Sequence, residues 1–329
     1  MDTVLLSKSD IEQLITMKEV VEIVDKTYKE LGEGKVINPP KLELELGDKT
    51  EWPPYGGRLH ALPAYVGWVD SAGVKWSGPF RGNPQLGLPF IMATILISDP
   101  RTGQLRAVMD GTHITNMRTG AQSAVSLKYL HNKKPIRIGI YGAGAQSYTT
   151  IMAISEFFNI EELRVYDIKR EASEKLAEGI KDRVTRDIII VDSPEEAADG
   201  DAVICVTQAE DKFLKNSWVK PGTVVLPVGS YLECEDALIL SADKIIVDHI
   251  VQTLHRGALK ELSERGKITE KDIYATIGEV AAGKKKGRTS DNERILSVAI
   301  GIGAMDVAVG TVVYQRALEK ELGGRFTFV

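Results

Sequence analysis

Cysteine is scarce in this sequence, and its histidines are scattered. Only two cysteines occur among the 329 residues: Cys205 lies in the apolar run DAVICV, and Cys234 lies between two glutamates in LECED. Two cysteines cannot build a disulfide framework or a cysteine-rich zinc site. His131, His249 and His255 lack the spacing of metal ligands. We therefore expect neither a disulfide framework nor a metal site.

The sequence also lacks an excess of charge of one sign. Lys and Arg number 41 against 46 Asp and Glu, which gives a formal net charge of −5 and an isoelectric point near 5.7. Proteins that bind nucleic acids present basic surfaces to the phosphates, so this balance gives no reason to expect such a partner. The basic run GKKKGR at residues 283–288 is typical of a solvated loop.

Long uninterrupted apolar runs are absent as well. The longest stretch, ILSVAIGIGAMDVAVGTVVY at residues 295–314, is interrupted by Asp306 and weakened as a helix by three glycines. A charge inside a membrane span is costly, so this stretch predicts a buried helix and its approach loop. The N-terminal segment MDTVLLSKSDIEQ becomes polar too early for a secretory signal. We expect a cytoplasmic protein without a membrane partner.

The composition that is present is typical of a globular protein with two domains. Hydrophobic residues make up 43% and charged residues 26% of the chain, and 329 residues exceed what one compact core usually holds. Near the N-terminus, Ser9 with Glu12 and Thr16 with Glu19 have capping-box spacing. The elements predicted in this part are a helix at 9–31, a half-exposed strand at 41–47, a hairpin around 99–103 and a helix at 118–130.

The pattern changes at about residue 132. Short apolar runs follow, most of them separated by helical or loop segments: IRIGIY, ELRVYD, DIIIVD, DAVICV, GTVVLPVG and DKIIVD. Strands that are buried on both faces have this composition. Their alternation with helices predicts βαβ units around a parallel sheet. After about residue 300 a long helix ends the chain, and the predicted fold class is α/β.

A glycine-rich turn follows the first of these strands. Residues 136–141 lead into Gly142, Gly144 and Ser147, in the pattern G-x-G-x-x-S, and a helix follows. In a dinucleotide-binding fold these glycines permit a tight turn and a close approach of the pyrophosphate, which binds at the helix N-terminus. Asp167 ends the next strand, near the offset at which an acid binds the ribose hydroxyls and favours NAD over NADP. The alternative is an ordinary strand-to-helix corner with a surface aspartate.

Three cations in the first part of the chain have apolar neighbours. Lys41 precedes the alternating strand, Lys75 lies in GVKW, and Arg118 lies in NMRTGAQS at a helix start. Arginine offers a planar fork to a carboxylate and lysine a point charge, so together they predict a carboxylate clamp. Taken singly, each is more typical of a surface or salt-bridged residue.

These segments together resemble the ornithine cyclodeaminase/μ-crystallin family. The resemblance rests on GVKW, GNP and GLP, on DPRTGQLRAVMDGTHITNMRTGAQSAVSLKYL, on IGIYGAGAQS and YDIKR, and on VGS, GRTS and AMDVAVG, and it covers residues 35–315. It implies a Rossmann dinucleotide-binding domain at 129–302 inserted in an α+β substrate-binding and dimerisation domain at 1–128 plus 303–329. It also implies a homodimer whose substrate domains form the interface.

The same resemblance implies roles for individual residues. Lys75 and Arg118, together with Lys41, would hold the substrate carboxylate. The residues that would bind the cofactor are Gly142, Gly144, Ala145, Gln146 and Asp167, with Thr207, Val228 and Ser230 on the nicotinamide side.

Two positions depart from the family pattern. Cyclodeaminases carry an Asp just after the VGG-type turn, where this sequence has Tyr231, and a Glu that engages the distal amine of ornithine, where it has His60. Glu233 and Glu235 are the nearby acids that would replace the Asp if the loop is shifted. His60 is suited to proton transfer near neutral pH, or it is an interior histidine bonded to a backbone group.

The predicted function is that of an NAD-dependent oxidoreductase which exchanges hydride at the Cα–N bond of an α-amino or α-imino acid. It would be an amino-acid dehydrogenase or a cyclic ketimine reductase, with Lys75 at the reacting centre and His60 or Tyr231 handling a proton. Two alternatives stay open. One is a redox-neutral, ornithine-type cyclodeaminase that releases ammonia, and the other is a non-catalytic, cofactor-bearing binding protein of the μ-crystallin type.

Overall fold

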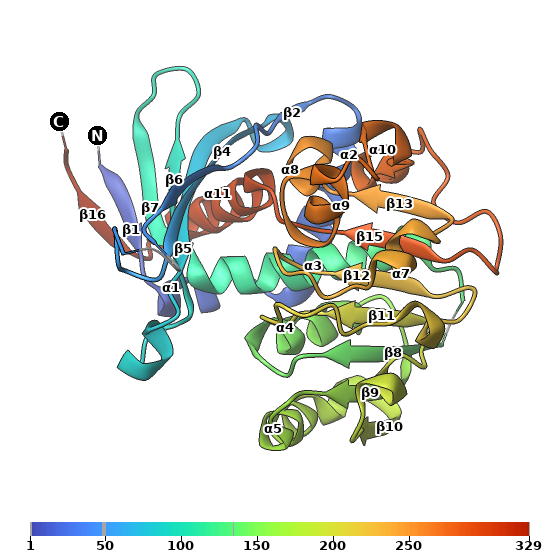
Figure 1. Cartoon of the computed structure of the whole chain (residues 1–329). Coiled ribbons are helices and arrows are strands. Elements are labelled where there is room, and N and C mark those ends of the chain that lie inside the picture. The colour runs from blue at the N-terminus through green and yellow to red at the C-terminus, as the bar shows by residue number, and fades with distance from the viewer. Residues whose placement is uncertain (1, 48–50, 134, 329) are drawn as a thin grey trace. The chain divides into compact units, whose positions relative to one another are not determined.

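The computed structural model describes residues 2–47, 51–133 and 135–328, and the chain folds into two compact units (Figure 1). Unit 1 comprises Met1–Arg118 and Ile302–Val329, and unit 2 comprises Thr119–Gly301. One boundary falls inside helix α3 (Thr112–Leu130), and the other immediately precedes helix α11 (Gly303–Glu319). Unit 2 is therefore inserted in the sequence of unit 1.

Unit 1 is built on an eight-stranded mixed sheet in the order β16-β1-β7-β6-β5-β4-β2, with β3 paired to β4. Its strands are β1 (Thr3–Leu6), β2 (Val36–Ile37), β3 (Leu42–Glu45), β4 (Arg58–Val66), β5 (Ser71–Pro79), β6 (Ile91–Ser98), β7 (Leu105–Asp110) and β16 (Gly324–Phe326). Helix α11 packs against β4, β5, β6 and α2 (Met17–Gly32), and α1 (Lys8–Glu12) packs against β7. The antiparallel pair β1 and β16 brings the two ends of the chain side by side (Figure 1).

The helix predicted at 9–31 is two helices. The capping box predicted for Ser9 is wrong, because α1 begins two residues earlier, where Ser7 and Asp10 form the box. Both spacings satisfy the same sequence pattern, so the pattern could not choose between them. The second predicted box is confirmed, since Thr16 and Glu19 cap the start of α2.

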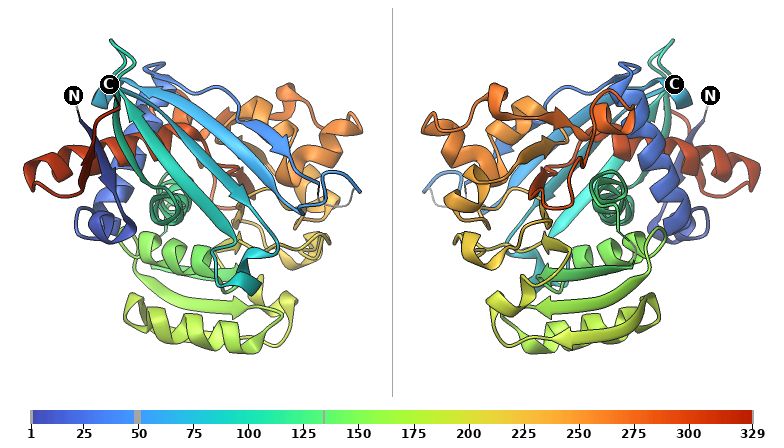
Figure 2. Two further views of the ribbon diagram at one scale, coloured as in Figure 1. Left: turned by 90° about the vertical axis from the view of Figure 1, so that its left-hand side faces the viewer. Right: turned by 90° about the vertical axis from the view of Figure 1, so that its right-hand side faces the viewer.

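The two faces of the unit 1 sheet differ in what covers them. Alternate residues of the central strands are buried on the face that α11 covers: Leu62, Ala64, Lys75, Ile95, Ile97, Ala107 and Met109. The outer face carries exposed apolar side chains: Leu42 (73%), Leu44 (51%), Trp76 (43%) and Met92 (47%). In the left view of Figure 2 these strands lie in front, with α11 behind them. The predicted half-exposed strand is thus β3, and its leucines face outward.

Unit 2 is a doubly wound parallel sheet, as predicted. Its strand order is β10-β9-β8-β11-β12-β15-β13-β14, and the pairings are parallel throughout. Its strands are β8 (Ile136–Tyr141), β9 (Ile160–Tyr166), β10 (Val184–Ile190), β11 (Ala202–Cys205), β12 (Val224–Pro227), β13 (Lys244–Val247), β14 (Ala275–Thr276) and β15 (Ile295–Val298). Its helices, besides most of α3, include α4 (Ala145–Ile154), α5 (Arg170–Ile180), α6 (Pro194–Ala197), α7 (Asp236–Leu240), α8 (Ile250–Leu254), α9 (Lys260–Glu264) and α10 (Ile277–Ala281).

The strand order reverses beside β8, where β9 and β10 lie on one side and β11 and β12 on the other. In open α/β sheets, ligands bind at such a switch point, outside the carboxyl ends of the strands. The fold therefore predicts a ligand site at the loops that follow β8, β9, β11 and β12.

The apolar stretch at 295–314 is not only a helix with its approach loop. Its first residues form β15, a strand between β12 and β13, and α11 begins at Gly303. Continuous apolar runs are shared by buried strands and buried helices, so periodicity could not separate the two here. Within the part of the chain that the structure describes, no helix is both long and apolar enough to cross a membrane.

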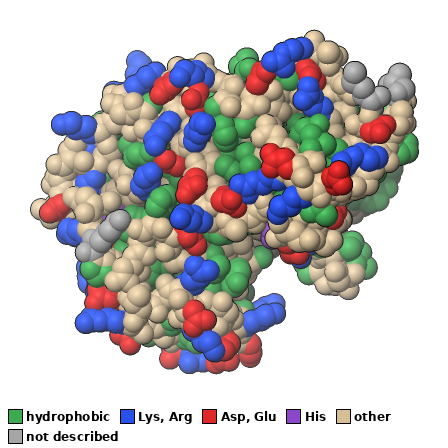
Figure 3. Space-filling view, turned by 180° about the vertical axis from the view of Figure 1, so that it is seen from behind, with side chains coloured by type: hydrophobic (Ala, Val, Ile, Leu, Met, Phe, Trp, Pro, Cys, Tyr) green, Lys and Arg blue, Asp and Glu red, His purple; other side chains and the backbone are tan. Residues whose placement is uncertain are grey.

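Charges of both signs cover the surface. In Figure 3, side chains of Lys and Arg are interspersed with those of Asp and Glu over the face drawn. Some of them form networks: Asp236 lies 2.6 Å from Lys212 Nζ and 2.6 Å from Arg265 Nη2. This mixed pattern agrees with the balanced composition of the sequence.

Candidate active site

The turn after β8 has the geometry that requires glycine. Gly142 has φ +89°, and a Cβ on it would lie 2.8 Å from the carbonyl oxygen of Val206. Its N–H donates to Tyr166 O at 2.8 Å, which ties the turn to the end of β9. A side chain at Gly142 would thus meet both backbone strain and a steric clash.

Helix α4 begins at this turn with an open N-terminus. Gly144 is its N-cap, and among the described residues no side chain caps the helix. A Cβ on Gly144 would meet no described atom within 4 Å, so the space in front of it is open. Ala145 and Gln146 are the first helical residues, and the N–H groups of a first helical turn point out of the end of the helix. Ser147 is buried, and its hydroxyl donates to Gly142 O at 2.5 Å, so this small residue closes the turn.

Asp167 lies beside the same turn in a fixed orientation. Its Oδ2 accepts a hydrogen bond from Ala143 N at 2.8 Å, and its Oδ1 accepts one from Lys169 N at 2.8 Å. Each carboxylate oxygen has a second lone pair, so both can still accept from a ligand hydroxyl. The open helix N-terminus, the bare Gly144 and this oriented carboxylate fit the diphosphate and ribose of a dinucleotide.

The loops after β11 and β12 are joined through a buried carboxylate. Glu233 is 1% exposed, and its Oε1 accepts hydrogen bonds from Thr207 N (2.8 Å) and Thr207 Oγ1 (2.6 Å). Burial raises the pKa of Glu233 to about 7, although both hydrogen bonds from Thr207 act to lower it. Glu233 therefore holds Thr207 in place, and it carries a carboxyl group that titrates near neutrality.

The other residues expected on the nicotinamide side follow β12. Val228 N donates to Cys205 O at 2.9 Å, and Val228 forms a bridge with Ala299. Ser230 is exposed and Tyr231 is half-buried. Glu235 accepts from Asn216 N at 2.8 Å, so its carboxylate is bonded to a loop next to α7.

Unit 1 contains a buried cluster of charged side chains, in which one anion lies between two cations. Asp306, in the first turn of α11, is fully buried and lies 2.8 Å from Lys75 Nζ through Oδ2 and 3.1 Å from Arg118 Nε through Oδ1. Lys75 comes from β5 and is 2% exposed, and Arg118 comes from α3 and is 6% exposed. Thr115 Oγ1 donates to Oδ1 of Asp306 at 3.3 Å. The structure thus brings Lys75 and Arg118 together, and the formal charges of Lys75, Arg118 and Asp306 sum to +1.

The electrostatics of this cluster follow from its burial. Burial, and after it the charge of Arg118, lower the pKa of Lys75 to about 8, although Asp306 acts to raise it. For Asp306 burial alone would raise the pKa, but Arg118 and Lys75 outweigh burial and hold that pKa below its usual range. The aspartate is therefore ionised, and the lysine carries its charge below about pH 8.

His60 lies on the same sheet and contacts a carboxylate. It pairs with Glu43 across β3 and β4, and its Nε2 lies 2.5 Å from Glu43 Oε2. Its partner is thus a side chain of the neighbouring strand. Lys41 directly precedes β3 and is half-buried, on the side of the strand that Glu43 shares.

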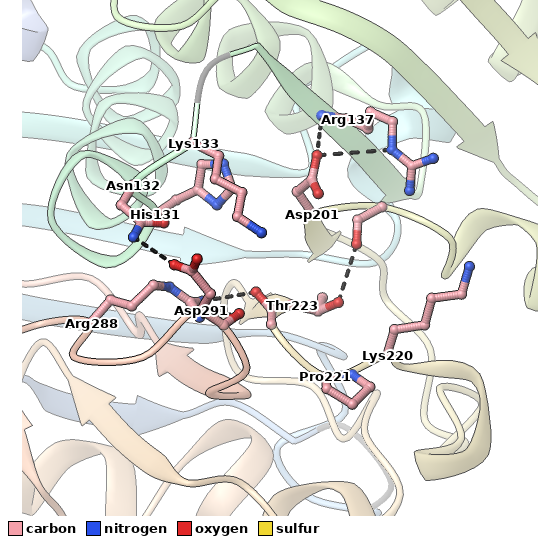
Figure 4. Close-up of a pocket in the computed structure, with 12 residues that line it drawn as sticks. His131, Asn132, Lys133, Arg137, Asp201, Lys220, Pro221, Thr223, Arg288 and Asp291 are labelled. Atoms are coloured by element: carbon pink, nitrogen blue, oxygen red, sulfur yellow. Dashed lines mark hydrogen bonds and ion pairs between the residues drawn. The ribbon is translucent and has the colours of Figure 1, made fainter.

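A second group of charged residues lies at the amino-terminal ends of the parallel strands of unit 2, in the segments that precede β8, β11 and β12 (Figure 4). These residues line a pocket, and they include His131, Lys133, Arg137, Asp201, Lys220, Arg288 and Asp291. Arg288, in the motif GRTS, donates to the carbonyl oxygens of Leu130 (2.8 Å), Gly222 (2.9 Å) and Glu293 (2.8 Å). These bonds join three separate loops, so Arg288 has a structural role at this edge.

Three functional candidates were missed or left open by sequence reasoning. Asp306 interrupts an apolar run, and that break was the available signal for a buried ion cluster. Glu43 alternates with leucines, a pattern that predicts only the polar side of a strand. Nothing in the local sequence indicated that Glu43 contacts His60. Glu233 gave no sign of its contact with Thr207, because the loops lie 26 residues apart. Within residues 2–47, 51–133 and 135–328, no three His, Cys, Asp or Glu side chains gather as metal ligands.

Comparison with known proteins gives matches over the whole chain. A model described as the ornithine cyclodeaminase/mu-crystallin family matches residues 1–321. An alanine dehydrogenase from Archaeoglobus fulgidus is 36% identical over 333 residues, which cover 100% of this chain and 99% of that protein.

Two solved structures are similar to this fold throughout. An archaeal alanine dehydrogenase dimer with bound NAD superimposes with a TM-score of 0.92 at 35% identity, covering 100% of both chains. A Delta(1)-pyrroline-2-carboxylate reductase from Thermococcus litoralis, in complex with NADH and L-proline, gives a TM-score of 0.91 at 35% identity. That match covers 98% of this chain and 99% of the other.

Proposed function

Since this chain belongs to the ornithine cyclodeaminase/mu-crystallin family, we propose that it is an NAD-dependent oxidoreductase acting on the Cα–N bond of an α-amino or α-imino acid. Its reaction is amino-acid dehydrogenation or the reduction of a cyclic ketimine. Unit 2 binds the dinucleotide, and unit 1 binds the substrate and forms the dimer. The location proposed with it is the cytoplasm, where thiols such as the free Cys205 and Cys234 stay reduced.

The observation that carries this proposal is the buried Lys75–Asp306–Arg118 cluster in a chain that also holds a dinucleotide-type turn. The three side chains carry a formal net charge of +1, which suits a ligand with one carboxylate, and every α-amino and α-imino acid has one. The three relatives compared above are named for substrates of that class, alanine and pyrroline-2-carboxylate. Together these points favour amino-acid chemistry over that of other NAD-dependent enzymes.

The chain's own residues supply positioning and charge. When bound, the nicotinamide ring accepts or donates the hydride. Lys75 and Arg118 hold the substrate carboxylate, so that Cα is presented in one orientation, and orientation is a large part of hydride-transfer catalysis. The positive charge beside Cα also stabilises negative charge that develops as hydride leaves or arrives. Gly142, Gly144, Ala145 and Gln146 bind the diphosphate through the backbone, and Asp167 binds the ribose hydroxyls.

The remaining residues shape the nicotinamide side and move a proton. Thr207, held by Glu233, lines that side together with Val228 and Ser230. Either His60, in unit 1, or Tyr231, which follows Ser230, exchanges a proton with the substrate. Lys41 adds a third positive charge at the substrate carboxylate.

The test is a screen of α-amino acids with NAD and of cyclic imines with NADH, followed by absorbance of the reduced nicotinamide while ammonia is measured in parallel. We expect a net change in NADH with an amino acid or imine that has an uncharged side chain. Ammonia released without a net change in NADH would instead indicate a cyclodeaminase. Binding of ligand and cofactor with neither change would indicate a non-catalytic binding protein.

We also infer that this chain forms a homodimer, in which the second copy docks on the outer face of the unit 1 sheet. Leu42, Leu44, Trp76 and Met92 leave an apolar surface there, although in a monomer such a face is normally polar. The similar archaeal alanine dehydrogenase is described as a dimer. A second copy would cover the same surface on both partners, as a twofold interface requires.

The expected result for Trp76→Glu is a monomer. A carboxylate placed in the centre of a buried apolar interface loses hydration without gaining a partner, at a cost of several kcal/mol. Light scattering should give twice the chain mass of 36.1 kDa for the natural protein and that mass alone for the variant. Leu318→Glu is the matched control, because Leu318 is similarly exposed (45%) but lies on α11. A dimeric Trp76→Glu protein would contradict this interface.

A further inference from the structure

Resting on the proposed function, we propose that Glu43 is a positioning residue for its proton transfer. The carboxylate of Glu43 holds Nε2 of His60, and Nδ1 of the same ring exchanges a proton with the α-nitrogen of the substrate. Glu43 acts through His60 and does not itself touch the substrate.

The contact between the two side chains fixes which ring nitrogen carries the hydrogen. Glu43 Oε2 and His60 Nε2 are 2.5 Å apart, and the two side chains are 17% and 12% exposed. When Glu43 is ionised its carboxylate can only accept hydrogen bonds, and the hydrogen in this contact then belongs to Nε2. In the neutral ring Nδ1 is then the basic atom, in the same way that a carboxylate sets the tautomer of a catalytic histidine.

The register of the sheet places this pair near the carboxylate cluster. Leu62 lies opposite Lys75, and His60 lies opposite Ser77, in the antiparallel pair of β4 and β5. Side chains alternate along a strand, so His60 shares the sheet face of Lys75. The Cα atoms of such diagonal neighbours lie roughly 7–8 Å apart. A substrate whose carboxylate binds Lys75 carries its nitrogen on the adjacent carbon, over the same face of the sheet as His60.

The charges of the pair suit an exchange of protons. In amino-acid oxidation the α-ammonium group gives one proton to Nδ1 of His60 and becomes an amine. The Cα–H bond then breaks, its electron pair leaves as hydride to NAD, and the nitrogen lone pair forms the C=N bond of an iminium ion. In the reverse direction Cα of the iminium receives hydride, and the amine takes the proton back from His60. The imidazolium formed in oxidation lies against the negative charge of Glu43, which stabilises it.

The first experiment reads the tautomer directly and needs no turnover. Long-range proton–nitrogen NMR of the full-length protein with ¹⁵N-labelled histidine distinguishes Nε2–H from Nδ1–H for each of the five histidines. His60→Gln assigns the signal of His60. We expect the Nε2–H form in the natural protein, and a shift towards mixed tautomers in Glu43→Gln. An Nδ1–H form, or a spectrum unchanged by Glu43→Gln, would overturn the proposal.

The second experiment measures the consequence for the reaction. Glu43→Gln should lower kcat by about 10²-fold, within the range of a general acid–base group, while KM for the amino acid changes less than about threefold. The matched control is Glu45→Gln, which removes the neighbouring cross-strand contact of Glu45 with Arg58 (3.6 Å) and should leave kcat unchanged. Equal kcat losses in the two variants would show a structural role only.

Chemical rescue separates positioning from folding. Free imidazole should restore about tenfold of the activity lost in His60→Ala, because it can bind where the ring was. The same addition should restore much less in the double variant His60→Ala/Glu43→Gln, which lacks the carboxylate that orients the added ring. Equal rescue in both backgrounds would overturn the role of Glu43. A natural protein with the expected tautomer but no turnover of any amino or imino acid would contradict the proposed function instead.

Discussion

Lys75→Met should reduce kcat/KM for the amino-acid substrate by about 10²–10³-fold, which is what the loss of one preorganised electrostatic group typically costs. The ammonium group of Lys75 is buried at 2.8 Å from Asp306, with Arg118 on the other side of that carboxylate. Removing it cancels the net positive charge of the cluster, because one cation and one anion remain. The clamp then has no excess charge for a substrate carboxylate.

The measurement is initial-rate kinetics of NADH formation, together with NAD binding. NAD affinity should be unchanged, since the residues proposed to bind NAD lie in unit 2 and Lys75 lies in unit 1. Lys29→Met serves as a control, because that lysine pairs with Asp25 at the surface of α2 (2.8 Å). Lys75→Met activity within a few-fold of the natural protein would remove Lys75 from the reacting centre.

The pH dependence of the natural enzyme should show the same group. The protonated form of Lys75 is the one that binds a carboxylate, and burial lowers its pKa from 10.5 to about 8. Substrate affinity should therefore fall as the pH rises through about 8, well before an exposed lysine would lose its charge. In Lys75→Met this alkaline limb of the profile should disappear.

Asp306→Asn should cause the largest loss of stability, about 3–5 kcal/mol, as expected when one partner of a buried ion pair is removed. The variant removes the anion that lies between the buried Lys75 and Arg118. Asparagine preserves the shape of the side chain, so the effect reports charge and not a cavity. The readouts are the urea and thermal midpoints at pH 7.

Two further measurements identify the cause of this loss. Asp306→Asn/Lys75→Met should be more stable than Asp306→Asn alone, because it removes one of the two repelling cations. The stability of the single variant should also recover as the pH rises. In the natural protein the pKa of Lys75 is lowered to about 8 while Asp306 acts to raise it, so the removal of Asp306 lowers this pKa further. Between that lowered pKa and the ordinary value of 10.5 the unfolded chain binds more protons than the folded one, so stability increases with pH there. Additive losses with no pH recovery would contradict the charge explanation.

The sequence alone predicted the parts of this molecule that depend on neighbours along the chain. The turn at Gly142 and Gly144, with Ser147 after it, follows from residues within one strand-to-helix connection. The parallel strands of unit 2 follow from short apolar runs. A strand-to-helix unit has few alternative folds, which is why local patterns were sufficient there.

The parts that failed depend on residues far apart in sequence. Asp306 is 231 residues after Lys75 and 188 after Arg118, and no local pattern pairs them. The partner of His60 lies on another strand, and only the sheet register brings Glu43 to it. The sequence pattern predicts the approach loop of a helix where the structure has strand β15. A run that is buried on all sides has no periodicity that distinguishes a strand from a helix or its approach.

The bonds of Arg288 bear on how this protein can be re-engineered. They fasten the loops around Leu130, Gly222 and Glu293 ahead of the parallel strands, away from the turns that follow those strands. The bonds of Arg288 therefore lie at one end of the parallel strands, and the turns proposed to bind the dinucleotide lie at the other end. An exchange of the turn bearing Asp167, proposed above to bind the ribose, leaves the bonds of Arg288 unaltered, so the replacement has to restore only the hydrogen bonds that Asp167 accepts from Ala143 N and Lys169 N.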